Sequence, residues 1–297
     1  MALVETLVEV SGEGTGGHGP AGPFAETAAP TGRAVVSSLR IIAVALVLVS
    51  MTLALWPLQA VAIRRGWPLA RRLPHLWHRV AVRTVGLRVH VRGVPATGRP
   101  LLMAANHQSW ADIVALGSVL PLSFIAKSDV RDWPGFGLLA RLQRTVFVER
   151  EARGRTGAQA DEIGERLTAG DAMVLFAEGT TSDGNRVLPF KTALFGAAQA
   201  SLRRSGVGAV LVQPVSIAYT RANGIAMGRF GRPLAAWPGD VTLLPHLASF
   251  LREGAVDVEI AFGEPIRFEP SSDRKAVARR CEREVATLLA RSLAQPL

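Results

Sequence analysis

The sequence contains a single cysteine, Cys281, among 297 residues. One cysteine excludes an intramolecular disulfide framework, a CxxC redox pair and a cysteine-rich zinc site, and it fits a protein that faces a reducing compartment. Cys281 lies within a charged helix expected over residues 273–293, where packing is its expected role. The chain also lacks the composition of a disordered protein, because 48% of its residues are hydrophobic and 20% are charged. A folded core is therefore expected.

Acidic side chains are scarce, since 34 Lys and Arg stand against 24 Asp and Glu and give a net charge of +10. The excess falls outside residues 1–33, which are themselves acidic. Such a body is attracted to nucleic acid, to anionic lipid headgroups or to an acidic carrier protein. The chain has no basic helix, zinc-ligand spacing or aromatic RNA-binding strand, so a nucleic-acid partner is not expected.

The N-terminal part of the chain contains a long run without any charge. Residues 11–33 are rich in Gly, Thr, Ala and Pro, the composition of a flexible tail, and no function is assigned to them. The 23 residues from Ile41 to Ile63 carry no charge, and a helix of that length measures about 35 Å, enough to cross a bilayer. Arginines instead of a small-residue cleavage site follow the run, which argues against a cleaved signal peptide.

Two geometries are open for this membrane segment. If the segment spans the membrane, expected to be a bacterial inner membrane, the arginines that follow it place the body on the cytoplasmic side. A kink at Pro57 would instead make a half-inserted hairpin with the next helix, which ends at Gly86. That helix has an apolar face and a basic face, typical of a helix on a membrane surface. The two faces consist of Leu73, Leu76, Trp77 and Val80 and, opposite them, of Arg72, His75 and Arg79.

Short apolar and β-branched runs predict strands after residue 86. Helical stretches alternate with several of them, which indicates an α/β fold with a layered, mixed or parallel central sheet flanked by helices. We therefore expect a flexible tail over 1–33, membrane-anchoring helices over 34–86 and an α/β domain over 87–297. The predicted strands cover residues 87–91, 101–105, 122–126, 145–148, 172–177, 209–219 and 256–262.

The segment from Ala104 to Ile113 joins the end of a predicted strand to a polar turn. His107 in this turn can take a proton from an alcohol, and Asp112 can fix the other ring nitrogen. No GxSxG nucleophile elbow occurs in the sequence, so the activated hydroxyl would belong to the substrate and the reaction would be a direct transfer. The structural alternative is a capping box between Ser109 and Asp112. One His and one Asp are too few for a metal site, and no metal is expected.

Two further polar segments follow predicted strands. Glu178, Gly179 and Thr180 begin a loop whose backbone N–H groups and hydroxyls can bind an anion or a polar headgroup, and Lys191 near a helix start can add a charge. Arg150 ends another strand and can clamp a phosphate or carboxylate. The structural alternatives are a turn with a solvated glutamate for the first segment and a surface salt bridge for the second.

Together these blocks resemble the 1-acylglycerol-3-phosphate acyltransferases, a family of lysophospholipid acyltransferases. The family mark NHxxxxD corresponds to Asn106, His107 and Asp112, and FVER ends in Arg150. The block FAEGT occupies residues 176–180, and an apolar strand with VQPV follows at 212–215. The resemblance covers about Leu87 to Phe268, and the hydrophobic N-terminal helices are similar to the family's membrane anchor.

The resemblance implies transfer of an acyl group to the hydroxyl of a membrane lysolipid. His107 would be the general base and Asp112 its orienting partner. The donor would be an acyl thioester of acyl carrier protein or coenzyme A, which leaves as a thiol without an acyl-enzyme or a bound cofactor. The residues implied in substrate binding are Asn106, Arg150, Glu178, Gly179, Thr180 and Lys191.

Thr181 departs from the family pattern, which often has EGTR with an arginine at this place. The family default acceptor is lysophosphatidate, and the missing cation places lyso-ornithine lipid, which a related branch acylates, nearly level with it. A catalytically inactive lipid-binding protein and a thioester hydrolase are the alternative functions. Acyl-chain length, oligomeric state and the choice between the two donors are left open by the sequence.

Overall fold

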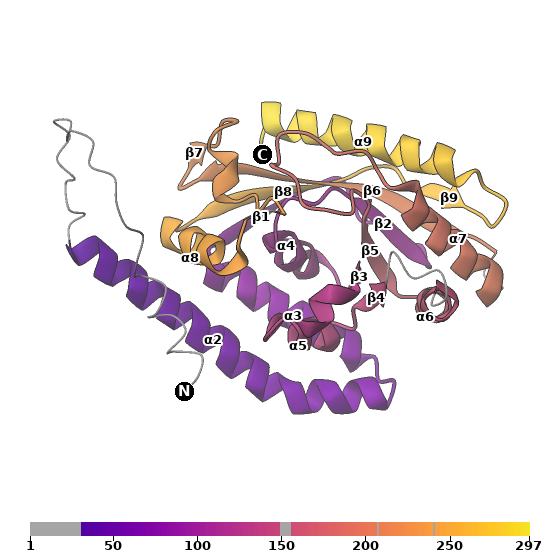
Figure 1. Ribbon diagram of the computed structural model, residues 1–297, viewed down its shortest axis with the longest axis horizontal. Helices are drawn as coiled ribbons and strands as arrows, with labels where there is room; N and C mark the ends of the chain where they lie inside the picture. Colours follow the sequence, from indigo (N-terminus) through magenta and orange to yellow (C-terminus); the bar gives the residue numbers. More distant parts are fainter. Residues whose placement is uncertain (1–30, 149–155, 207, 240) are drawn as a thin grey trace, which may run out of the picture. The chain divides into compact units, whose positions relative to one another are not determined.

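The computed structural model of this protein describes residues 31–148, 156–206, 208–239 and 241–297. Its centre is one mixed β-sheet whose strands lie in the order β1-β8-β6-β2-β5-β3-β4 (Figure 1). The short strands β7 and β9 pair with β6 outside this order. The strands are β1 (Leu87–Arg92), β2 (Leu101–Ala105), β3 (Ser123–Lys127), β4 (Val146–Val148), β5 (Ala172–Phe176), β6 (Val210–Ala222), β7 (Ile225–Ala226), β8 (Val256–Phe262) and β9 (Ile266–Phe268).

Most neighbouring strands run parallel, and this decides where loop residues meet. β2 pairs in parallel with both β5 and β6, so Ala105 stands beside Phe176 on one side and beside Val215 on the other. β6 pairs in antiparallel with β8 and β9. The sheet is therefore mixed, as the sequence predicts, and the segments after β2 and β5 leave it at the same edge.

Helices cover both faces of the sheet, and the alternating side chains of β2 show the two layers. Leu101, Met103 and Ala105 belong to a core with α3, α4 and α8. Leu102 and Ala104 point to the other core, with α6, α7 and α9. Figure 1 shows α9 on one side of the sheet and α3 and α4 on the other. The helices after α3 are α4 (Ala111–Val119), α5 (Phe136–Leu142), α6 (Thr156–Thr168), α7 (Thr192–Ser205), α8 (Leu243–Glu253) and α9 (Arg274–Ala294).

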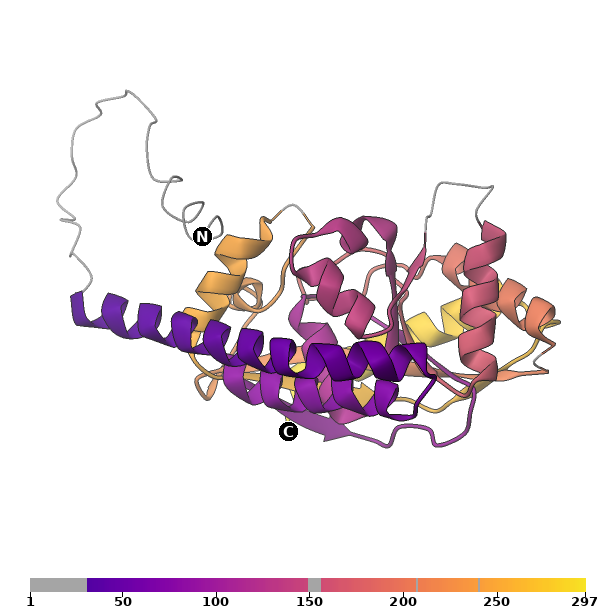
Figure 2. The ribbon, with the colours of Figure 1, turned by 90° about the horizontal axis from the view of Figure 1, so that it is seen from below.

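The two N-terminal helices form an antiparallel hairpin against this layered body. α2 (Thr31–Arg64) and α3 (Leu69–Val85) run side by side in Figure 2. The Gln59 amide donates to the carbonyl of Ala70 (3.0 Å), and the Trp77 indole donates to the Thr52 hydroxyl (3.0 Å). α2 stays helical through Pro57, so the hairpin with the next helix, one of the two geometries left open by the sequence, is formed by the turn after Arg64 and not by a kink at Pro57.

The apolar face of α3 also differs from the sequence prediction. Leu73 is buried as expected, but Leu76 is exposed and His78 is buried in its place. The cause is the close packing of α3 on α4, which turns a mixed face inward. Gly86 ends α3 in the left-handed conformation (φ 87°), as predicted, and a β-carbon there would lie 2.2 Å from the Gly254 carbonyl oxygen.

Among the described residues, α2 is the one helix long and apolar enough to cross a membrane, over Val36–Arg64. Within the unit Ser37–Leu297 its buried contacts are few, with Val44, Gln59 and Ala62 packed inward. The rest of its surface is apolar and exposed. The large hydrophobic side chains that α2 exposes from residue 37 onward are Leu39, Ile42, Leu46, Val47, Val49, Leu53, Trp56, Leu58, Val61 and Ile63.

Candidate active site

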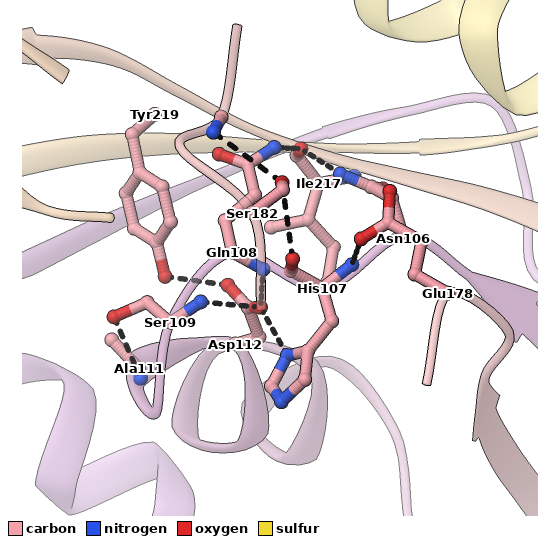
Figure 3. A network of polar contacts seen from close by, with 11 residues as sticks. Asn106, His107, Gln108, Ser109, Ala111, Asp112, Glu178, Ser182, Ile217 and Tyr219 are labelled. Atoms are coloured by element: carbon pink, nitrogen blue, oxygen red, sulfur yellow. Dashed lines mark hydrogen bonds and ion pairs between the residues drawn. The ribbon is translucent and has the colours of Figure 1, made fainter. Parts of the chain in front are cut away.

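The predicted catalytic residues lie at the sheet edge where β2 and β5 end. His107 follows β2 by two residues, and Glu178 follows β5 by two residues. Because these strands are parallel neighbours, the two loops start side by side. The structure brings residues from both loops into one hydrogen-bonded network, which Figure 3 shows.

His107 and Asp112 form the centre of this network. The His107 Nδ1 lies 2.7 Å from Asp112 Oδ2, which also accepts the backbone N–H groups of Gln108 (2.7 Å) and Ser109 (2.9 Å). Asp112 is completely buried. Since this carboxylate oxygen acts as an acceptor throughout, Nδ1 carries the proton of the imidazole and Nε2 keeps a free lone pair. The His107 side chain remains 18% exposed, so a substrate hydroxyl can reach it.

The other oxygen of Asp112 is held by Tyr219, the sole tyrosine of the chain. The Tyr219 hydroxyl donates to Asp112 Oδ1 at 2.7 Å from the middle of β6. Complete burial, followed by the charge of Asp112, raises the pKa of Tyr219 well above its ordinary value, so the hydroxyl stays protonated and donates. Sequence analysis did not identify this residue, although a lone tyrosine inside an apolar strand is a signal.

Asn106 and Gln108 attach the loop to β6. Asn106 Oδ1 accepts the N–H of Ile217 (2.8 Å), and its Nδ2 donates to the Ile217 carbonyl (3.0 Å). Gln108 Nε2 donates to the same carbonyl at 2.5 Å. Asn106 has no exposed surface. Its amide therefore fixes the position of the catalytic loop and does not face solvent.

Glu178 has a similar structural position on the β5 side. Its Oε2 accepts the His107 N–H (3.0 Å) and its Oε1 accepts the Leu188 N–H (2.8 Å). The residue is completely buried, and burial raises the pKa of its carboxyl group from 4.5 to about 7. Glu178 thus joins the two loops behind His107, which is a position for orienting the base.

The remaining residues of the second loop differ in exposure. Ser182, which sequence analysis did not select, donates to the His107 carbonyl from its N–H (2.9 Å) and its hydroxyl (3.2 Å). Gly179 has a φ of 73°, the left-handed conformation that lets the chain turn here. Thr180 is exposed. The predicted Thr180 side chain is therefore accessible from solvent, whereas Ser182 is buried.

The two cations predicted to bind the acceptor are Lys191 and Arg150, and the structure describes the first of them. Lys191 is exposed directly before α7, and its N–H donates to the Ala177 carbonyl (2.7 Å), close to the start of the Glu178 loop. Arg150 lies outside the described residues. Lys191 is therefore the predicted cation whose place near this sheet edge can be given.

Phe176 forms the floor under the catalytic imidazole. Its ring stacks on His107 with centroids 3.9 Å apart and an interplanar angle of 13°, and Phe124 stacks on Phe176 in turn. A parallel aromatic ring at this distance restricts the rotation of the imidazole. The network therefore holds one base, in one tautomer, at one orientation.

The arrangement supplies general base chemistry, and among the described residues no serine, threonine or cysteine side chain bonds to His107 Nε2. In the described part of the chain, no three His, Cys, Asp or Glu side chains gather as metal ligands. Cys281, the sole thiol, lies on α9 and is completely buried in the core that this helix shares with α6 and α7.

Residues 86–218 match the Acyltransferase family. The lyso-ornithine lipid O-acyltransferase of Brucella abortus is 57% identical to this chain over 87% of the chain and 97% of the relative. The enzyme of the same name from Rhizobium meliloti is 49% identical over 86% of this chain and 87% of the relative.

A solved structure shares the fold. The crystal structure of the 1-acyl-sn-glycerophosphate (LPA) acyltransferase PlsC from Thermotoga maritima superposes with a TM-score of 0.60 over 89% of this chain and 98% of that chain, at 22% identity. The mixed α/β fold of this chain thus occurs in an acyltransferase of known structure. With relatives matched over nearly their whole length, this chain belongs to the lysolipid acyltransferase family and is an acyltransferase.

Proposed function

We propose that this enzyme transfers a fatty acyl group from an acyl thioester to the hydroxyl of a lyso-ornithine lipid. The observation that carries the proposal is the His107 and Asp112 pair, with a free Nε2 and no adjacent protein nucleophile, in a chain 57% identical to a lyso-ornithine lipid O-acyltransferase. Lysophosphatidate, the default acceptor expected from the sequence, is therefore the comparison substrate.

The geometry supports a direct transfer. His107 Nε2 takes the proton of the acceptor hydroxyl while that oxygen attacks the thioester carbonyl carbon, and Asp112 stabilises the imidazolium that forms. The tetrahedral intermediate collapses, the carbon–sulfur bond breaks, and the thiolate takes the proton back from the imidazolium. The products are an ester and a free thiol. A positioned base contributes about 10²- to 10⁴-fold to such a rate.

Charged side chains around the site suit an ornithine headgroup, which brings a carboxylate and a side-chain ammonium group. Thr181 is neutral where a phosphate-binding arginine is expected from the family pattern. Asp183, next to the serine that binds the His107 carbonyl, is exposed, and Arg232 acts electrostatically on the same carboxylate. A loop that presents both signs of charge favours a zwitterionic headgroup over a phosphate.

The donor is proposed only as an acyl thioester. Acyl carrier protein and coenzyme A present the same thioester to His107, and no cofactor is required by the proposed steps. The excess of basic residues in the chain suits an acidic carrier protein and an anionic membrane alike. Both thioesters are therefore tested as donors in the assay.

We also propose that α2 lies along one leaflet and does not cross the bilayer. Near its start Arg40 donates to the Gly254 carbonyl (2.8 Å), and near its end Gln59 donates to the Leu142 carbonyl (2.7 Å). These contacts tie about 28 Å of helix to the body, while the outward face stays apolar. The N-terminus and the catalytic body would then both lie on the cytoplasmic side of a bacterial inner membrane. In sealed right-side-out vesicles, a tag at the N-terminus should resist added protease; digestion of the tag would contradict this topology.

An acyl-transfer assay on membranes tests the function. Labelled acyl thioesters of acyl carrier protein and of coenzyme A are offered as donors, with lyso-ornithine lipid or lysophosphatidate as acceptor. His107→Ala is compared with His75→Ala, which changes a half-buried histidine of α3 that contacts the Gly117 carbonyl outside the His107 network. We expect acylation of lyso-ornithine lipid that His107→Ala abolishes. Preferred acylation of lysophosphatidate would overturn the acceptor. Release of free fatty acid without acyl-lipid would instead indicate a hydrolase, and full activity of His107→Ala would overturn the mechanism.

A further inference from the structure

A cluster of arginines lies at the sheet edge opposite His107. The buried carboxylate of Asp171, directly before β5, forms ion pairs with Arg71 of α3 (2.6 Å), Arg166 of α6 (2.5 Å) and Arg144 (3.1 Å). β5 starts at this edge and ends at the catalytic edge, a length of about 17 Å. The cluster is therefore separate from the proposed acyl-transfer site.

Positive charge is crowded at this edge. Arg99 points its guanidinium group at carbonyls of its own loop, and burial and the charge of Arg71 lower the pKa of Arg99. Burial, followed by the charge of Arg166, lowers the pKa of Arg144. The carboxylate of Glu162, in the same helix, interacts electrostatically with Arg166. The excess positive charge therefore lies on the guanidinium groups of Arg71, Arg99 and Arg144. Partly desolvated cations in excess favour a bound anion.

The cluster has space for such an anion. Arg71 borders two hollows. One of about 200 Å³ is also lined by Arg99, Ser123 and the ion-paired Asp171, and one of about 110 Å³ is also lined by Arg144. One water accounts for about 30 Å³ of the liquid, so either hollow holds a group larger than a single water. Guanidinium groups offer paired N–H donors that match the oxygens of a phosphate.

The smaller hollow borders the end of the apolar helix α2. Ile63 and Trp67 line it, and Trp67 is half exposed in the turn between α2 and α3. Tryptophan next to basic residues at the end of an apolar helix is typical of the interface between membrane and water. A phosphate that reaches this place belongs to a lipid headgroup at that interface.

We infer that Arg71, Arg99 and Arg144 form a binding site for the phosphate of an anionic phospholipid headgroup, which holds the turn between α2 and α3 at the membrane surface. The ligand is a bulk membrane lipid and not the acyl acceptor. The inference stands independently of the acceptor proposed above, because it concerns the other edge of the sheet.

Vesicle binding tests the site with a matched control. The purified full-length protein is partitioned onto phosphatidylcholine vesicles with and without phosphatidylglycerol. R71Q/R99Q is compared with R72Q/R79Q, which removes the same charge from exposed positions of α3. The general electrostatic attraction of the protein to anionic vesicles should weaken about fivefold for each arginine removed, in both variants. We expect R71Q/R99Q to lose at least a further fivefold of its preference for anionic vesicles. Equal losses in the two variants would overturn the inference.

Two further measurements distinguish misfolding and free phosphate from the proposed lipid. Arg99→Gln alone keeps every ion pair of Asp171 and should still lower the preference for anionic vesicles more than Arg79→Gln does. In detergent, short-chain phosphatidylglycerol should raise the Tm of the protein more than inorganic phosphate at the same concentration, and R71Q/R99Q should abolish this rise. An equal rise with inorganic phosphate would overturn the assignment to a lipid.

Discussion

The carboxylate of Asp112 takes part in both local folding and the proposed chemistry. Its Oδ2 accepts the N–H groups of Gln108 and Ser109, and the same oxygen binds His107. The bond from the Ser109 N–H is one half of the capping box that the sequence leaves open, but the N-cap of α4 is Trp110, without a side-chain cap bond, and not Ser109. The backbone bonds fix the carboxylate, and the fixed carboxylate orients the imidazole.

Tyr219→Phe removes the hydroxyl that binds the second oxygen of Asp112. A hydrogen bond to a charged group contributes about 1.5–3 kcal/mol, so we expect kcat to fall by roughly ten- to a hundredfold while KM for the acceptor stays the same. The carboxylate, without this donor, attracts the imidazolium more strongly, so the acid limb of the kcat profile should move to higher pH. Steady-state kinetics across pH measure both effects.

Thr220→Val is the control, because it removes a buried hydroxyl from the next position of β6, where the partner is the Asp257 carbonyl. It should leave the pH profile in place. A Tyr219→Phe enzyme with the wild-type profile and kcat would show that the hydroxyl has no part in orienting the base.

Glu178 gives the stability of the protein a pH dependence. Its pKa is about 7 in the folded protein against about 4.5 in the unfolded chain, so the folded state binds more protons between these values. The contribution is fully present below pH 4.5 and is lost as pH rises to about 7, a change on the order of 3 kcal/mol. Glu178→Gln should remove this downward slope from the free energy of unfolding, measured by tryptophan fluorescence in detergent.

The exposed Glu264→Gln is the control for this measurement and should keep the slope. If the unfolding free energy of Glu178→Gln falls between pH 4.5 and 7 as steeply as that of the wild type, Glu178 is not the group that titrates there.

At the scale of elements, the contact between α3 and α4 depends on the absence of one side chain. A β-carbon at Gly117 would lie 2.4 Å from Cδ2 of His78, which is buried in α3. Overpacking of this kind costs about 1–3 kcal/mol, against a gain of about 1 kcal/mol in helix propensity. We expect Gly117→Ala to lower the free energy of unfolding in denaturant titrations. Ser118→Ala, one residue further along α4, should not lower it; equal effects would show that the contact has no special cost.

The strands were predictable because each is a short apolar run bounded by polar turns. All seven predicted runs contain a strand, whereas the short strands β7 and β9, with two and three residues, were not predicted. The hairpin of α2 and α3 was less predictable. Pro57 suggested a break, because a proline inside a helix removes one backbone hydrogen bond and bends the helix, but α2 continues through it to Arg64.

The candidate site was predictable where its residues are adjacent in sequence. His107 and Asp112 could be paired because they are five residues apart. Tyr219 and Ser182 could not be paired with them, because their contacts depend on the parallel register of β2 with β6 and β5. Sequence alone did not supply that register.

At the scale of the whole molecule, basic charge and apolar surface act together. The chain carries +10 overall, and α2 adds a continuous apolar face that no described part of the body covers. Electrostatic attraction to anionic lipid weakens with salt, whereas burial of apolar side chains in the bilayer does not. The two contributions to membrane binding can therefore be separated by experiment.

Leu46→Asp and Leu53→Asp should each lower partition onto vesicles at high salt. Both side chains are exposed on the outward face of α2, and burial of a leucine contributes about 1.5–3 kcal/mol, so the expected loss is at least about tenfold for each. Since neither side chain is packed into the body, the Tm in detergent should not change. Val94→Asp, at an exposed apolar position after β1, is the control and should bind like the wild type. Unchanged partition of both α2 variants would mean that this face does not enter the membrane, and the exposed leucines of α2 would then need a protein partner instead.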